Sequence, residues 1–246
     1  MRTRIATVVA LICVVGNVVP AASDCYVVKR NGSKVKGVSL KAETDGTLKL
    51  QMERNGPTQT FKKGSYRFGY VPRPKEVVSL EKAIDADKHD LVLKHAPQLF
   101  DRYKYLGWGD YISYLEGMAY IAKKQFSQAK TSLERGSNFR AKHEEELLQG
   151  MVLALLGLKD IDRAKPMLTK MMKSADRGMA AFSFNARGDI LVQEGKKKEA
   201  VLEYLKTLLL FQPGSVDRER DKARTQAVAL LKELKDSRWQ EIQKID

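Results

Sequence analysis

The chain is poor in the residues that build disulfide-linked folds and metal sites. Its 246 residues include 2 cysteines and 3 histidines. Two cysteines are too few for a disulfide-rich scaffold or a cysteine-based zinc site. His89 and His95 would lie on different faces of a helix, and His143 has no histidine partner at the i, i+4 spacing of metalloproteases. We therefore expect no bound metal and no cofactor.

Motifs for catalysis are also missing. There is no phosphate-binding P-loop and no Gly-x-Ser-x-Gly nucleophile turn, and Gly107-Trp108-Gly109 lacks the third glycine of a dinucleotide site. These absences predict a protein that is not an enzyme. An unrecognised active site remains the alternative, and it would require a cluster of perturbed acids in the folded chain, such as Asp189 with Glu116.

No apolar run reaches the roughly 18 to 20 residues that a membrane-spanning helix requires. The one long apolar stretch, residues 5–19, follows Arg2 and Arg4 and precedes small residues that end at Ser23. This pattern predicts a signal peptide over residues 1–23, export to the periplasm, cell envelope or exterior, and no transmembrane span in the mature chain. An uncleaved N-terminal anchor is the alternative. If the signal peptide is cleaved, Cys13 leaves with it and Cys25 is the only cysteine of the mature chain. Cys25 is then a buried residue that opens a strand, a free or paired thiol, or a lipidated cysteine.

Positive charge is concentrated near the N-terminus. The whole chain has 44 basic and 30 acidic residues, and residues 24–75 hold 12 and 4 of them. Such a basic surface favours binding to an anionic envelope component, either a lipid headgroup or a wall polymer, whereas export argues against a nucleic acid partner. The alternative is that these lysines bind no ligand and serve only solubility and the protection of exposed strand edges from pairing with other chains. The candidates for this basic patch are Lys29, Arg30, Lys34, Lys36, Lys62 and Lys63.

Residues 24–72 read as short strands. Asn31-Gly32, Asp45-Gly46 and Asn55-Gly56 are turn-forming pairs, and apolar and polar residues alternate between them. We expect five antiparallel strands that close into a small barrel-like module, followed by a proline linker at residues 73–75. This pattern loosely resembles the Sm-like or SH3-like modules that precede helical repeats in some exported bacterial proteins.

The remainder, residues 76–246, reads as helices that repeat. Three alanines at positions where helices would cross are 35 and 36 residues apart. A small side chain is expected twelve residues before each alanine, and large side chains occur nine residues before and four residues after it. The alanines are Ala129, Ala164 and Ala200; the residues twelve before are Gly117, Val152 and Gly188; those nine before are Tyr120, Leu155 and Leu191; those four after are Leu133, Leu168 and Tyr204. Residues 75–96 suggest an earlier, degenerate pair, with Asp110 as a possible N-cap of the helix that follows.

These residues resemble the tetratricopeptide-repeat (TPR) family, although Val152 departs from the small residue usual at its position. The resemblance implies a mainly α fold, a right-handed solenoid of about nine helices that ends in a capping helix from about residue 216. It also implies a groove lined by the first helix of each pair, where a peptide or helix would bind. The groove candidates are Tyr111, Tyr114, Met118, Gln149, Leu153, Phe182, Asn185 and Asp189. Packing against the neighbouring repeat is the alternative role for their aromatic rings.

Together these features predict an exported, non-enzymatic scaffold that binds a segment of a protein partner in the TPR groove. The alternative gives the main role to the basic β module, which would attach to an anionic envelope component and use the solenoid as a spacer.

Overall fold

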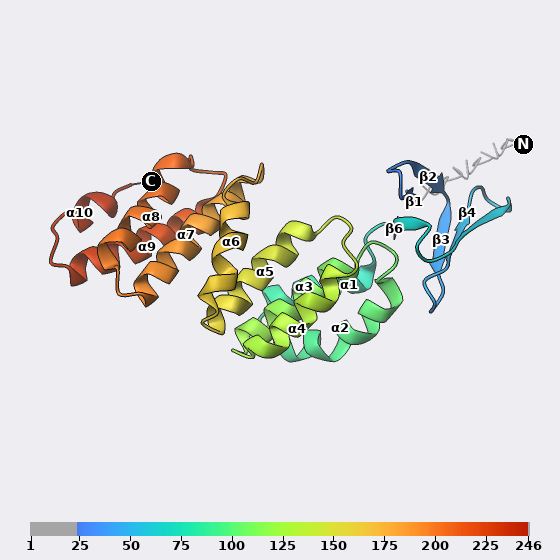
Figure 1. Cartoon of the computed structure of the whole chain (residues 1–246), viewed down its shortest axis with the longest axis horizontal. Coiled ribbons are helices and arrows are strands. Elements are labelled where there is room, and N and C mark those ends of the chain that lie inside the picture. Colours follow the sequence, from blue (N-terminus) through green and yellow to red (C-terminus); the bar gives the residue numbers. More distant parts are fainter. Residues whose placement is uncertain (1–23, 246) are drawn as a thin grey trace, which may run out of the picture.

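The computed structural model describes residues 24–245. The predicted signal peptide, residues 1–23, lies outside the described residues. Figure 1 shows the strands at one end of an elongated molecule, with the helices leading away from them toward the C-terminus. The protein is therefore mainly α with a small β module before the helices, as the sequence predicts.

Six strands form two antiparallel sheets of three strands each, in the orders β2-β1-β6 and β3-β4-β5. The strands are β1 (Cys25–Lys29), β2 (Lys34–Gly37), β3 (Ser39–Ala42), β4 (Leu48–Gln51), β5 (Thr58–Phe61) and β6 (Tyr66–Tyr70). The sequence predicts five of them and misses β2. Val35 is the one large apolar residue in β2, so its four residues show no recognisable alternation.

The two sheets enclose a common core. Val27, Leu48 and Leu50 have no exposed surface. The chain passes from one sheet to the other after Gly37, where a Cβ atom would lie 2.4 Å from the carbonyl oxygen of Gln51. Cys25 is a free cysteine, buried in this core at the start of β1, which agrees with the expectation of a buried residue that opens a strand.

The three turn-forming pairs of the sequence do form turns between strands. Gly32 and Gly46 have φ angles of 84° and 90°, and in the third turn Asn55 takes the positive value, 65°. Local side chains support these turns, because the carboxylate of Asp45 accepts a hydrogen bond of 2.8 Å from the backbone N–H of Thr47. This is the turn chemistry that asparagine, aspartate and glycine provide.

Ten helices follow as five antiparallel pairs. They are α1 (Lys75–Asp85), α2 (His89–Tyr103), α3 (Gly109–Ala122), α4 (Phe126–Ser137), α5 (Glu144–Gly157), α6 (Ile161–Met171), α7 (Arg177–Gln193), α8 (Lys197–Leu210), α9 (Asp217–Glu233) and α10 (Trp239–Ile242). The predicted capping helix from about residue 216 is divided into α9 and the short α10, because Lys235 adopts a φ of 56° that ends α9. This break accounts for the tenth helix.

The same backbone turn joins the two helices of every pair. Each turn has one residue in the left-handed region, and the residue after it donates its N–H to a carbonyl five positions before it, as in the Schellman motif. The left-handed residues are Asp87, Lys124, Lys159, Gly195 and Lys235. Recurrence of one local structure at intervals near 36 residues is the structural form of the repeat seen in the sequence.

Glycine lets the first and third predicted repeats pack closely. A Cβ atom on Gly117 would lie 2.7 Å from Leu133, and one on Gly188 would lie 2.6 Å from the ring of Tyr204. The second repeat has Val152 opposite Leu168 at the corresponding positions, and both are fully buried. Because Val152 has a branched side chain where its counterparts have none, α6 packs less closely on α5 than α4 on α3 or α8 on α7.

The β module is joined directly to the helices. Strand β6 donates from the N–H of Gly69 to the carbonyl of Tyr105, 3.1 Å away, in the loop between α2 and α3. The indole N–H of Trp108 donates to the carbonyl of Val71 at 3.0 Å. These bonds hold the module against the first two helical pairs.

Candidate functional site

The first helices of the pairs, α3, α5, α7 and α9, pack side by side and form the layer in which the sequence places a binding groove. Four of the groove candidates there, Tyr111, Tyr114, Met118 and Gln149, are half-buried and keep surface available. Phe182 is only 4% exposed and belongs to a buried apolar cluster with residues of α5 and α6. Its ring therefore packs against the neighbouring repeat, which is the alternative role given above for the aromatic candidates.

The polar candidates on α7 connect helices to each other. Asn185 is fully buried; its amide nitrogen donates to the carboxylate of Glu219 at 2.7 Å, and its oxygen accepts from the hydroxyl of Thr207 at 2.8 Å. Asp189 accepts from the hydroxyl of Tyr204 at 2.7 Å, and its other oxygen accepts from Lys222 at 2.8 Å. These two side chains therefore fix α7 to α8 and α9.

The layer of first helices contains a cavity of about 610 Å³, here named the first-helix hollow. It lies between the N-terminal ends of α5, α7 and α9. Six carboxylates and two cationic side chains line it, so its charge is mainly negative. The lining residues are Ala141, Lys142, Glu144, Glu145, Glu146, Gln149, Asp176, Gly178, Met179, Ser215, Val216, Asp217, Arg218 and Glu219.

Of the groove candidates, Gln149 lines the first-helix hollow directly. Tyr114 lies beside the next residue of α5, because a Cβ atom on Gly150 would lie 3.3 Å from its ring. Burial and the carboxylate of Glu146 raise the pKa of the Tyr114 hydroxyl, and the charge of Arg218 opposes this effect. The sequence could not have indicated Asp176 or Arg218 as neighbours of Gln149, since the repeat pattern does not specify how successive pairs curve around each other.

The loop between α4 and α5 is held in place by Asp110. The sequence suggests Asp110 as an N-cap, but α3 begins one residue earlier, and the buried carboxylate instead accepts from the backbone N–H groups of Ala141 at 2.7 Å and His143 at 3.1 Å. His143 consequently lies 4.3 Å from the ring of Tyr111, centroid to centroid. Lys142 lies 3.6 Å from the ring centroid of Tyr70 in β6.

The acids named for an unrecognised active site are in separate places. Glu116 is buried between α3 and α4, where it accepts hydrogen bonds from Ser132 and Arg135. Asp189 is bonded to Tyr204 and Lys222, as described above. The two carboxylates therefore belong to different helical pairs and do not form a cluster.

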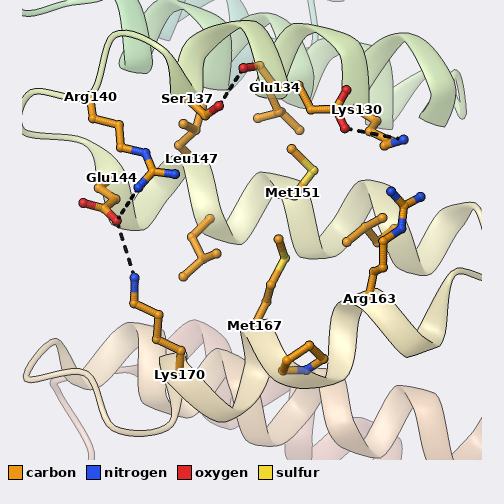
Figure 2. Close-up of a pocket in the computed structure, with 14 residues that line it drawn as sticks. Lys130, Glu134, Ser137, Arg140, Glu144, Leu147, Met151, Arg163, Met167 and Lys170 are labelled. Carbon is orange, nitrogen blue, oxygen red and sulfur yellow. Dashed lines mark hydrogen bonds and ion pairs between the residues drawn. The ribbon is translucent and has the colours of Figure 1, made fainter.

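A second cavity, of about 500 Å³, opens between α4 and α6, above the side of α5 that they leave uncovered; we name it the α4–α6 groove. Figure 2 shows Met151 of α5 between the side chains of α4 and those of α6. The floor is apolar and the rim is charged. The lining residues are Lys130, Leu133, Glu134, Ser137, Arg140, Glu144, Leu147, Leu148, Met151, Leu155, Arg163, Pro166, Met167 and Lys170.

The basic-patch candidates lie on the sheet β2-β1-β6 and on its adjoining turns. Lys36 is opposite Tyr26, and Lys34 is opposite Val28, so both lysines point to the face of the sheet away from the β-module core. A Cβ atom on Gly64 would lie 3.7 Å from the guanidinium of Arg30, which places Arg30 beside the turn that holds Lys62 and Lys63. Lys29 is half-buried at the end of β1, and the other five candidates are exposed.

Acidic residues are few on this side of the module, where Asp24 directly precedes β1. The acids of residues 24–75 other than Asp24 occur next to β3 and β4, where Glu43 pairs with Lys49. Within the described part of the chain, none of the six candidates forms an ion pair. Lys34 and Lys63 instead lie over aromatic rings, 5.1 Å from the ring centroid of Tyr26 and 5.7 Å from that of Tyr105.

Residues 24–245 contain no group of three or more histidine, cysteine, aspartate or glutamate side chains placed to hold a metal ion. Over the same residues, no helix is both long enough and apolar enough to span a membrane.

Comparison with known proteins identifies the helical part. The family model of the tetratricopeptide repeat-like domain matches residues 76–241. No curated protein and no solved structure matches the chain. The matched residues cover more than half of the chain and coincide with the five helical pairs. The chain therefore belongs to the tetratricopeptide repeat-like domain family.

Proposed function

We propose that this protein is an exported, non-enzymatic scaffold that binds a segment of a partner protein in the first-helix hollow. Membership of the tetratricopeptide repeat-like family supports the general role, which is protein–protein interaction. The specific site rests on one observation: the ends of three first helices leave a cavity of about 610 Å³ between them. Its size is in the range of cavities that bind ligands.

The lining of the hollow suggests which kind of segment fits. Glu144, Glu145 and Glu146 begin α5, and Asp217 and Glu219 begin α9, so carboxylates face the cavity from two sides. Met179 and Val216 add apolar surface. Opposite charges across an interface favour association and select among partners. We therefore expect a partner segment that carries lysine or arginine next to an apolar residue.

Capture from an extract of the host cell envelope tests this proposal. The Gln149→Lys variant places a positive charge in the hollow and should abolish capture of the partner. The matched control is Gln128→Lys, which makes the same change at an exposed position on α4. Loss of the partner with Gln149→Lys alone supports the proposal. Equal capture by the wild type and both variants contradicts it.

A second candidate function is favoured by the charge separation in the β module. The exposed side chains of Arg30, Lys34 and Lys36 face solvent on a sheet that has no acidic residue. Such a surface suits an anionic envelope component, whether lipid headgroup or wall polymer. Binding of the chain to vesicles that contain anionic lipid, or to an isolated wall polymer, should fall steeply with added salt and with Lys34→Glu/Lys36→Glu. Binding that is unchanged by added salt and by Lys34→Glu/Lys36→Glu excludes this function.

A further inference from the structure

The α4–α6 groove adjoins the second repeat, in which α6 packs less closely on α5 than the second helices of the neighbouring pairs pack on their first helices. The side chains of α4 and α6 stand on either side of α5. One row of apolar side chains, Leu147, Met151 and Leu155, runs along the floor at i, i+4 and i+8. This row extends for about 12 Å, a little over two helical turns.

The spacing of the floor matches one class of occupant. Residues at i, i+3 or i+4 and i+7 form the apolar stripe of an amphipathic helix, and a stripe of this kind packs along another helix when that helix carries a complementary row. In the α4–α6 groove the walls add apolar surface from Met167 and Pro166 of α6. A partner helix would thus lie on α5, between α4 and α6.

Charge on the rim determines what such a helix carries on its flanks. Four cationic side chains line the groove against two carboxylates. Lys130 pairs with Glu134, and Arg163 pairs with Asp160 at the start of α6. Arg140 and Lys170 share one oxygen of Glu144, at 3.3 and 3.4 Å (Figure 2). Both distances are long for charge-assisted hydrogen bonds, so these cations remain open to another carboxylate.

The charged surface continues past the end of the groove. An adjoining cavity of about 680 Å³ shares Glu144, Leu148, Pro166 and Lys170 with it and adds Glu145 and Lys173. The side chain of Lys170 is 71% exposed. Charged side chains of both signs therefore continue past the groove, with Lys170 as the exposed cation at the junction.

We propose that the α4–α6 groove is a second docking site, which binds an amphipathic helix with acidic residues beside its apolar stripe. The site adjoins the first-helix hollow at Glu144, which lines both cavities, and takes a segment of the opposite charge. The protein would thereby join two partners, or two segments of one partner, through different sides of the same repeat.

Binding of two synthetic amphipathic peptides to the full chain, followed by fluorescence anisotropy, tests this proposal. Both peptides have the same leucine stripe, one flanked by glutamates and the other by lysines. The measurement uses the Gln149→Lys chain, whose hollow is blocked, in a buffer of about 0.15 M salt. The glutamate peptide should bind this chain at least tenfold more tightly than the lysine peptide does. Equal affinities for the two peptides would overturn the proposal.

Variants locate the binding. Met167→Glu should weaken binding of the glutamate peptide at least tenfold, and Arg163→Glu/Lys170→Glu should remove the preference for it. The matched control is Leu209→Glu, which changes an exposed leucine on α8, a helix that does not line the groove. An equal loss with Met167→Glu and Leu209→Glu would overturn the proposal, because it would show nonspecific adhesion. The peptide comparison uses the chain whose hollow is blocked by Gln149→Lys, so its failure leaves the proposed function of the hollow standing.

Hydrogen exchange provides a readout that does not depend on substitutions. With the glutamate peptide bound, amides of α5 and α6 that line the groove should exchange more slowly, whereas those of α8 should not change. Protection confined to other helices would contradict the assignment of this groove.

Discussion

The buried carboxylate of Asp110 accepts a hydrogen bond from the backbone N–H of His143, although the two residues belong to different helical pairs. The same carboxylate accepts from the N–H of Ala141. Through this one side chain, the start of α3 fixes the loop that carries Lys142 into the first-helix hollow and against Tyr70 of the β module.

Replacement of Asp110 tests that role. Asp110→Ala removes the side-chain acceptor of three backbone N–H groups, those of Tyr111, Ala141 and His143, so we expect the free energy of unfolding to fall by about 2 kcal/mol or more. Urea denaturation measures this change. The control is Asp101→Ala, an exposed residue whose side chain pairs with Lys104 and whose loss should cost less than about 0.5 kcal/mol. Equal effects of the two substitutions would show that the loop is held by other contacts.

The turns between paired helices allow a stabilising substitution. Lys159 has a φ of 60°, and Gly195 occupies the equivalent position of the next repeat. Because a side chain is unfavourable in the left-handed region, Lys159→Gly should raise the free energy of unfolding by about 0.5 to 1 kcal/mol. Lys94→Gly, in the middle of α2, is the control and should lower it by about 1 kcal/mol. A loss of stability in both variants would contradict the turn geometry.

Alkaline pH should weaken the β module through Tyr66. Its hydroxyl donates to the carbonyl of Gly46, and burial raises the pKa of this tyrosine to about 12 from a usual value of 10.0. The folded state thus keeps a proton that the unfolded chain releases above about pH 10, so the stabilisation is complete below that pH and is lost as the pH rises toward 12.

Urea denaturation of the wild type and Tyr66→Phe checks this effect. At about pH 9 the variant should be less stable by about 1 kcal/mol, because the hydrogen bond is lost. At about pH 11 the difference should shrink, since only the wild type has a phenol whose ionisation opposes folding. A difference that stays constant between the two pH values would show that Tyr66 does not titrate with folding.

The repeat was predictable because it depends on local patterns. Ala129, Ala164 and Ala200 recur at nearly equal intervals, and all three have no exposed surface where paired helices cross. Turn residues such as Asn31-Gly32 and Asp45-Gly46 likewise determine short-range structure by their own chemistry. Such features require no knowledge of how distant segments meet.

The candidate site was only partly predictable for the opposite reason. Gln149 was assigned from its place in the repeat, but the hollow that it lines includes Asp176 and Arg218, which depend on the curvature of the whole solenoid. Asn185 and Asp189 occupy groove positions in the family pattern, yet contacts with α8 and α9 use their polar atoms. In the sequence, the sign of the looser packing beside the α4–α6 groove is Val152, which stands where the other two repeats have Gly117 and Gly188.

Photo-crosslinking in the native cell tests the central claim most directly. A photo-crosslinking amino acid at Gln149 lies in the first-helix hollow, and the same amino acid at Lys94 lies on the exposed surface of α2. We predict a discrete crosslinked product of the chain with one partner protein at position 149 and none at position 94. The absence of a product at 149, or the same products at both positions, would contradict the account.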